Sequence, residues 1–439
     1  MRNKYFSILA LVKENLFSSN GQLFFENIVW LSADKFLRLL IGVVVGAWVA
    51  RYLGPADFGL LSYALVFCSF FSAVATLGFD GIVVRELSTK NQSASKILGT
   101  AFCLRFIAGI TLFGISVFVI TTIETSSELI SVIIIIALGL MFQSADVIDL
   151  WFQSQSQSKR TIFSRGIAYL IANALKVLIV INEYSLVYFA FVSFIEILVS
   201  SGILLATYKK VVKKINWIFD RQTAISLLKE SWPYLLSSIS ILVYMRIDQV
   251  MIRALAGNAE LGLYSAAVGL SSVFNAIPII LVIAAGPIAA RLSVDNSLAF
   301  KKLLCSLFSV IWWSMLPIGL IVFFFSEFII SGMYGSEYIS ASDVLAVHIF
   351  TNLPIGLGVI QSLWIINSKK SALVIYKTCI GAAVNIGLNF LLIPIYGAIG
   401  AAFASLIAQS ISAVFTNILF APEIFKLQLK SIFFLKTKA

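Results

Sequence analysis

Long apolar runs separated by short polar stretches fill the chain from about residue 24 to about residue 421. The runs lack the two-residue alternation of half-buried strands, and about 20 apolar residues are enough for one helix to cross a bilayer. Because backbone groups in lipid must satisfy one another, unbroken runs of this length predict helices rather than barrel strands. Twelve spans are predicted, at about residues 24–50, 58–79, 97–121, 128–149, 161–181, 186–208, 231–255, 261–285, 303–325, 340–366, 371–394 and 397–421.

The composition agrees with a polytopic membrane protein. Of 439 residues, 60% are hydrophobic and 12% are charged, whereas about 25% are charged in a soluble domain. The N-terminal stretch MRNKYFSILALVKENLFSSNG has no small-residue cleavage site, so we expect an interfacial lead-in rather than a removable signal peptide. The expected fold class is an all-α integral membrane protein.

One phrase occurs twice in the chain, about 203 positions apart. It reads GPADFGLLSYALVF from Gly54 and GNAELGLYSAAVGL from Gly257, so that Gly59 recurs as Gly262. Each copy follows the first predicted span of one half and opens the second, where a glycine lets two helices approach closely. With six spans per half, both halves enter the membrane from the same side, which predicts a parallel repeat. The alternative is a single helix-turn-helix packing solution used twice.

The longest basic stretch, KKVVKKINWIFDRQ at 209–222, falls midway and predicts a linker between the two halves. The expected organisation is an N-terminal six-helix bundle at 1–208, a basic cytoplasmic linker at 209–230, a C-terminal six-helix bundle at 231–421 and a basic cytoplasmic tail at 422–439.

The distribution of positive charge predicts the orientation. In a soluble domain the formal net charge of +11 would suggest nucleic acid. Here we expect no nucleic-acid partner, because Lys and Arg accumulate in the cytoplasmic loops of membrane proteins. If the N-terminus is cytoplasmic, about 25 Lys and Arg residues lie in inner segments, Arg165 and Lys377 among them, whereas the outer loops hold only Arg51 and Arg253. This asymmetry predicts that both termini are cytoplasmic.

Charged residues at bilayer depth are costly and are therefore candidates for function. The deep basic residues are Lys35, Arg38, Arg105, Lys176 and Arg246, and the deep acidic residues are Asp34, Asp146, Glu196 and Asp248. In the first span, Asp34 and Arg38 could pair at i,i+4, which would leave Lys35 as excess positive charge. Arg246 and Asp248 lie in the first span of the second half, so both first spans bring cations toward the interface between the halves. The alternative is a buried ion-pair network that holds the halves together.

Other polar residues in the spans are weaker candidates. Arg105 lies about two turns from the inner end of its span and could extend to the interface. His348, the single histidine, is one turn from Asn352; it could carry protons, or simply bond to a neighbouring helix. Asn385 and Asn389 are interpreted as hydrogen-bonding groups between helices.

Catalytic signals are absent from the sequence. It has no GxxxxGK[ST] phosphate loop, no HExxH motif and no nucleophile elbow, so we expect no enzyme activity and no cofactor. The four cysteines lie inside apolar runs without CxxC spacing, which predicts neither a metal site nor a disulfide. The longest outer loop, at 326–342, is too short for the site of a glycosyl polymerase.

Several phrases together resemble the bacterial polysaccharide exporters, especially the O-antigen flippases. The resemblance covers essentially the whole chain, and the phrases that carry it are LIGVVVGAWVARYLGPADFGLLSYA from residue 40, LGFDGIVVREL at 77–87, DLWFQSQSQSK at 149–159, RIDQVMIRALAGNAELGLYSAA at 246–267, GSEYISASDVL at 335–345 and LNFLLIPIYGAIGAA at 388–402.

The resemblance implies the fold of the multidrug/oligosaccharidyl-lipid/polysaccharide exporter (MOP) superfamily, in which two six-helix bundles form a V that opens to each side alternately. It implies a bacterial inner-membrane flippase that moves undecaprenyl-pyrophosphate-linked oligosaccharides to the periplasmic leaflet, with a polysaccharide polymerase and a chain-length regulator as further partners. By analogy, the pyrophosphate contacts would be Lys35, Arg38 and Arg246, with Arg105 as a further candidate. Arginine binds phosphate bidentately and lysine acts as a point charge.

Without an ATP site, an ion gradient is the expected energy source, and the candidate coupling residues are Asp34, Asp146, Asp248 and His348. A drug/cation antiporter of the same fold is the main alternative. It predicts a cavity of negative charge, whereas five deep basic residues face four deep acidic ones here. An integral-membrane glycosyl polymerase is the third hypothesis.

Overall fold

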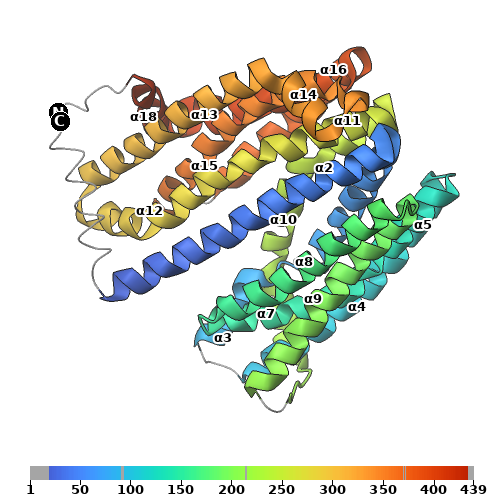
Figure 1. Cartoon of the computed structure of the whole chain (residues 1–439). Helices are drawn as coiled ribbons and strands as arrows, with labels where there is room; N and C mark the ends of the chain where they lie inside the picture. Colours follow the sequence, from blue (N-terminus) through green and yellow to red (C-terminus); the bar gives the residue numbers. More distant parts are fainter. Residues whose placement is uncertain (1–18, 90–92, 213–214, 369, 371, 434–439) are drawn as a thin grey trace.

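The computed structural model describes the backbone of residues 19–89, 93–212, 215–368, 370 and 372–433, and side chains from Arg38 onward. Within these ranges the chain is helical apart from short turns and contains no strand. Ten of the described helical segments are long and apolar enough to cross a membrane. The expected all-α class is therefore confirmed (Figure 1).

The first half of the chain forms one group of helices, which we call the first bundle. Its helices are α2 (Ser19–Ala75), α3 (Asp80–Thr89), α4 (Ala94–Ile123), α5 (Ser127–Ala137), α6 (Gly139–Phe142), α7 (Val147–Ser154), α8 (Ser158–Ile181) and α9 (Leu186–Val212). A 3₁₀ turn at Gln143–Asp146 joins α6 to α7, so that α5 to α7 form one continuous span.

The second half forms the second bundle. Its helices are α10 (Arg221–Ala256), α11 (Asn258–Ser271), α12 (Ala276–Asp295), α13 (Ser297–Tyr334), α14 (Ala341–His348), α15 (Asn352–Asn367), α16 (Ala372–Ser410), α17 (Thr416–Phe420) and α18 (Pro422–Ile432). A π-helical turn at Ile411–Phe415 joins α16 to α17. The described part of the expected C-terminal tail is thus the helix α18, which packs against α13, where the Ser309 hydroxyl donates to the Ser431 carbonyl over 3.0 Å.

Two glycines account for the difference between ten segments and twelve predicted spans. Gly54 has φ 72° inside α2 and Gly397 has φ 57° inside α16. These angles are open to glycine and break the helix at each point. The helix α2 has 57 residues and the apolar segment that contains Gly397 has 49, enough for two crossings each. The described segments therefore supply the twelve spans that the hydropathy pattern predicts.

The two bundles share a core at one end only. One apolar cluster joins buried residues of both bundles, such as Leu61 and Ile133 with Leu261 and Tyr264. At the opposite end each bundle has a separate cluster, around Phe152 in the first and around Phe308 in the second. We call these the closed end and the divergent end. Figure 1 shows the bundles meeting near the α2 and α11 labels and separating toward α3 and α12.

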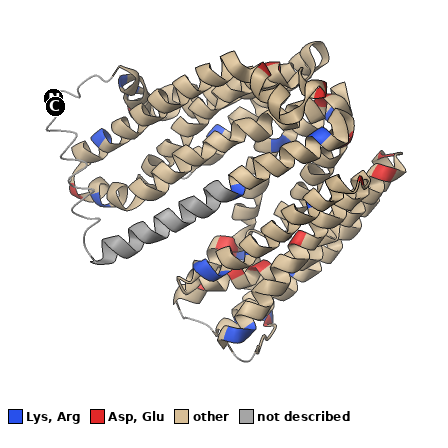
Figure 2. Cartoon of the chain, viewed as in Figure 1, with Lys and Arg blue, Asp and Glu red and all other residues tan. Residues whose placement is uncertain are grey.

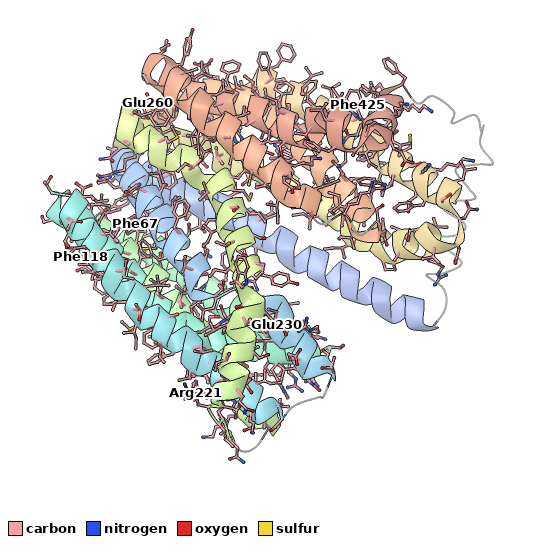
Figure 3. All side chains as sticks on the ribbon, turned by 180° about the vertical axis from the view of Figure 1, so that it is seen from behind. Phe67, Phe118, Arg221, Glu230, Glu260 and Phe425 are labelled. Carbon is pink, nitrogen blue, oxygen red and sulfur yellow. The ribbon has the colours of Figure 1, made fainter. Side chains whose placement is uncertain are left out.

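The helix α10 contacts both bundles. It begins at Arg221, inside the segment expected as a linker, and the Asp220 carboxylate caps it by accepting from the Thr223 amide over 2.9 Å. Its first turns lie against the first bundle, since a Cβ on Gly78 would be 2.8 Å from the Ser231 carbonyl oxygen. Its later turns pack against α16 and α2. Figure 3 shows α10 running from Arg221 toward the closed end, where α11 carries the labelled Glu260.

Candidate functional site

The repeated phrase forms a reciprocal contact at the closed end. A Cβ on Gly59 would lie 1.9 Å from the Asn258 carbonyl oxygen, and a Cβ on Gly262 would lie 1.9 Å from the Pro55 carbonyl oxygen. Each copy therefore presses its glycine against the backbone of the other copy, which requires the absence of a side chain. The expectation that these glycines let two helices approach closely is confirmed.

An ion pair joins the two bundles beside this contact. Arg253 on α10 donates to the carboxylate of Glu124, which follows α4, and its guanidinium lies 4.1 Å from the centre of the Tyr63 ring. Burial raises the pKa of Glu124, but hydrogen bonds from Arg253 and from the Ser126 and Thr125 amides outweigh it, and the pKa is held below its ordinary value. The sequence placed Arg253 only as an outer-loop charge; its partner could not be predicted.

The first-span candidates are described in part. Asp34 and Lys35 belong to α2, but their side chains lie outside the described residues, so the Asp34–Arg38 pairing stays a prediction. The Arg38 guanidinium donates to the Ile162 carbonyl over 3.1 Å and lies 5.5 Å from the centre of the Tyr169 ring. These contacts hold Arg38 against α8 in the first bundle.

Arg246 is available to a ligand. It is exposed in the last third of α10 and makes no hydrogen bond or ion pair with any described residue; its charge acts on the buried Asp248, two residues further on. Figure 2 shows that Lys, Arg, Asp and Glu occupy scattered positions on helices that are otherwise uncharged. The helix that presents Arg246, α10, is one of those that contact both bundles.

Arg105 is committed to a contact within the first bundle. Only 3% of its side chain is exposed, and it donates to the Asp80 carboxylate over 2.6 Å and to the Thr76 carbonyl over 3.1 Å. It therefore turns inward to join α4 to the start of α3, rather than extending to the membrane interface as the sequence suggested.

Asp146 also has a local partner. Arg165 on α8 bonds to Asp146 over 3.0 Å and to Asp149 over 3.1 Å. The sequence counted Arg165 among the inner-segment charges, at the start of the predicted span 161–181. In the structure it lies in the second turn of α8, and two carboxylates of the preceding segment share its single positive charge.

The second bundle holds a buried polar cluster around Asp248, which is 8% exposed. The Tyr264 hydroxyl donates to the Asp248 carboxylate, and the Ser405 hydroxyl lies 3.5 Å from the same oxygen. Asn385 donates to Ser405 over 3.4 Å, and Asn389 donates to Asn385 over 2.9 Å. The fold thus brings together Asp248 of α10 and the two asparagines of α16, which the sequence indicated only separately.

His348 extends this cluster. Its Nδ1 lies 3.0 Å from the Ser271 hydroxyl on α11, and its ring meets the Tyr264 ring edge-on at 5.9 Å. Asn352 donates to the same Ser271 hydroxyl over 3.0 Å. The side-chain oxygens of Asn352 and Asn389 are buried without a donor. No group of three His, Cys, Asp or Glu residues suited to a metal ion occurs in the described part of the chain.

Lys377 is the buried charge that sequence reasoning missed. It was counted among the inner-segment charges, near the start of the predicted span 371–394, and the structure shows it in α16 with 6% of its surface exposed. Its Nζ donates to Gln361 over 2.6 Å and to Asn417 over 2.8 Å. The sequence did not indicate this burial.

Comparison with known proteins identifies a family and a fold. The sequence profile of the family described as polysaccharide biosynthesis protein matches residues 24–293. Among curated proteins no sequence match was found. An inward-facing multidrug resistance MATE family transporter of the MOP superfamily is similar in structure, with a TM-score of 0.74, 13% identity, and coverage of 92% of this chain and 96% of that one.

Two other solved structures extend the comparison. The lipid II flippase MurJ, in an inward closed conformation, has a TM-score of 0.71 and 15% identity, over 92% of this chain and 91% of its own. A MOP superfamily transporter from Pyrococcus furiosus has a TM-score of 0.64 and 13% identity, over 91% and 96% of the two chains. At these identities the likeness establishes the MOP fold.

Proposed function

The chain belongs to the polysaccharide biosynthesis protein family and is a membrane transporter of the MOP fold rather than an enzyme, and on this premise we propose that it is a flippase for undecaprenyl-pyrophosphate-linked oligosaccharides. It would carry O-antigen or similar repeat units from the cytoplasmic to the periplasmic leaflet. The observation that carries this proposal is Arg246, which is exposed on α10 and makes no hydrogen bond or ion pair with the described residues.

The chemistry of the substrate explains the requirement for such a group. A pyrophosphate head group cannot cross hydrocarbon without a positive partner, and arginine offers two parallel donors to phosphate oxygens. Arg105 is paired with Asp80 and Arg165 with Asp146 and Asp149, so these cations are already neutralised. We propose Arg246 as the main head-group contact, with Lys35 as a second. Arg38 is held by α8, and we propose it as a minor contact to the head group.

We place the divergent end toward the cytoplasm. Its helix ends carry Lys96, Arg160, Arg221 and Lys301, whereas Arg51 and Arg253 are at the closed end. The inward-facing form of the MATE transporter also matches better than the outward-facing form, with TM-scores of 0.74 and 0.62. A lipid-linked substrate would then enter from the cytoplasmic leaflet, with its prenyl tail remaining in lipid.

For the energy source we propose an ion gradient that acts on the Asp248 cluster. Asp248 combines burial with several oxygen partners, and the unsatisfied oxygens of Asn352 and Asn389 lie in the same connected group. An ionised carboxylate in such a place needs a cation or a proton. Asp146 is less suited because Arg165 already neutralises it.

The location of the accumulated lipid intermediate tests the proposal in cells. Deletion should leave oligosaccharide-linked lipid on the cytoplasmic face, and wild-type protein should restore surface polysaccharide whereas Arg246→Ala should not. Accumulation of single units on the periplasmic face would instead indicate a defect in polymerisation. The proposed polymerase and chain-length regulator would act after flipping.

A drug/cation antiporter is the second candidate, because the MATE transporters among the similar structures are named for multidrug resistance. The exposed Arg246 disfavours a cationic cargo. If Arg246→Ala cells keep normal surface polysaccharide while drug efflux falls, the antiporter is the correct function.

A further inference from the structure

The two bundles place a cation at equivalent positions but give it different partners. In the first bundle Arg165, on the fifth span, contacts Asp149, 16 residues earlier in the chain, over 3.1 Å. In the second bundle Lys377, on the fifth span, contacts Gln361, also 16 residues earlier, over 2.6 Å. A carboxylate in one bundle is thus replaced by an amide in the other.

The replacement leaves Lys377 without a counter-charge. Asn417 accepts a second hydrogen bond from its Nζ over 2.8 Å and itself donates to Gln428 of α18 over 3.1 Å. Gln361, Asn417 and Gln428 are each at most 1% exposed. No carboxylate forms an ion pair with Lys377 among the described residues. Arg165, by contrast, has 42% of its side chain exposed and two carboxylate partners.

This shell suits a lysine that gains and loses a proton. A buried ammonium without a counter-charge is costly, and lysine, unlike arginine, can release its proton inside a protein. Amide side chains can serve both forms, because their oxygens accept from an ammonium and their NH₂ groups can donate to a neutral amine. A permanent ion pair would need a carboxylate at the place of Gln361, as in the first bundle.

The surroundings of Lys377 connect it to α10. The Ser412 hydroxyl, in the π-helical turn, donates to the Lys377 carbonyl over 3.0 Å. One turn along α16, a Cβ on Gly381 would be 2.8 Å from the Tyr244 ring of α10 and 3.0 Å from the Ser412 side chain. A change at Lys377 therefore acts on a tightly packed contact with the helix that reaches both bundles. Figure 3 shows α10 passing between them and Phe425 marking α18.

We propose that Lys377 is a proton-binding site that controls the equilibrium between arrangements of the two bundles. Water at the divergent end supplies the proton, which converts the amine to an ammonium. Because the amide shell lacks a counter-charge, the ammonium favours an arrangement in which the shell opens, so proton binding disfavours the present one. The inference rests on the transporter function proposed above, but not on which lipid is carried.

Other titratable groups near the site are few. Those nearest in the chain or in contact with its surroundings are Tyr376 and Cys379 of α16 and the Tyr244 hydroxyl of α10, with Glu423, Lys426 and Lys430 on α18; Arg246 and Asp248 lie further along α10. Tyr244 contacts the same packing point, but its hydroxyl titrates at high pH, outside the range of the test below.

The test measures the distance between the bundles as a function of pH. Spin labels on Gln155→Cys and Ser297→Cys, both exposed near the divergent end, report this distance in full-length protein in nanodiscs after replacement of the native cysteines. In otherwise wild-type protein, the population of the present arrangement should fall as the pH is lowered from about 9 to about 6, the range in which buried lysines can take up a proton. Lys377→Met should keep this arrangement throughout, and Lys377→Arg should disfavour it throughout. Lys370→Met, which removes an exposed lysine of the same end, should behave as wild type.

A second variant keeps the proposal testable if substitution of Lys377 impairs folding. Gln361→Glu copies the carboxylate of the first bundle and should hold the ammonium in place, so that the present arrangement persists to pH values at least about one unit lower. A flat wild-type profile, or an unchanged profile in Lys377→Met or Gln361→Glu, overturns the proposal. If the pH profile is as expected but the protein does not flip the lipid, only the proposed substrate is wrong, and the proposal for Lys377 stands.

Discussion

Gly59 and Gly262 occupy equivalent places in the two copies of one phrase, and each lies against the backbone of the other copy at the closed end. This reciprocity makes the repeat a contact between the bundles as well as a record of duplication. It also holds the two bundles together at the closed end, so any opening of the divergent end must pivot about this contact.

A methyl group at either glycine should separate the bundles at the closed end. Gly262→Ala would put its Cβ 1.9 Å from the Pro55 carbonyl oxygen, and overpacking of this kind costs about 1–3 kcal/mol. We expect a lower melting temperature in detergent and a shift away from the present arrangement. The control is Gly46→Ala in α2, where a Cβ meets nothing within 4 Å and the melting temperature should not fall. Equal melting temperatures for both variants would contradict the close contact.

Acid should weaken the closed end through Glu124. Because the folded-state pKa of Glu124 is depressed below its ordinary value of 4.5, the ion pair with Arg253 contributes fully above that value and is lost as the pH falls through the lower folded-state pKa. We expect wild-type stability, measured by thermal melting between pH 7 and pH 3, to decline at the acidic end more than that of Glu124→Gln. The difference at neutral pH should be about 1 kcal/mol. Parallel profiles of the two proteins would show that the pair contributes nothing.

Arg105 should contribute to the stability of the fold and not to substrate transport. Arg105→Met removes its bonds to Asp80 and Thr76, and because the Asp80 side chain is 67% exposed and stays hydrated, the expected cost is about 1–3 kcal/mol. Purified variant protein should melt at a lower temperature, while the flipping rate per folded molecule remains near that of wild type. If the variant is stable but no longer flips the lipid, Arg105 is a substrate contact.

Asp248→Asn should uncouple transport from the ion gradient. The amide can still bond to Tyr264 and Ser405, so the fold should hold, but it cannot carry the charge that attracts a cation or proton. In proteoliposomes, an imposed gradient should accelerate the wild type and leave Asp248→Asn unaffected. Asp295→Asn, an exposed carboxylate at the end of α12, is the matched control and should respond as wild type does. A gradient response that survives in Asp248→Asn would rule out this cluster as the coupling site.

The spans and the contact at Gly59 could be predicted because hydropathy and glycine spacing are local properties of the chain. The partners of the buried charges could not, because they depend on which helices become neighbours. Arg105 meets Asp80 on a short helix that the span pattern did not indicate. Lys377 lies near the start of the predicted span 371–394, but its burial could not be predicted because its partners Gln361 and Asn417 belong to other helices. Lys377 follows Gln361 by 16 residues, as Arg165 follows Asp149. This shared spacing points to equivalent contacts in the two bundles, but it can be recognised only once both contacts are known.

The rate at which purified protein inverts an undecaprenyl-pyrophosphate-linked oligosaccharide in proteoliposomes tests the central claim most directly. Arg246→Ala should lower that rate about tenfold or more without a change in melting temperature, because removal of a charge-assisted contact costs about 1.5–3 kcal/mol. Arg246→Lys should retain part of the rate, and Lys302→Ala, which removes a partly exposed lysine of α13, should have none of these effects. A wild-type rate in Arg246→Ala would contradict the account.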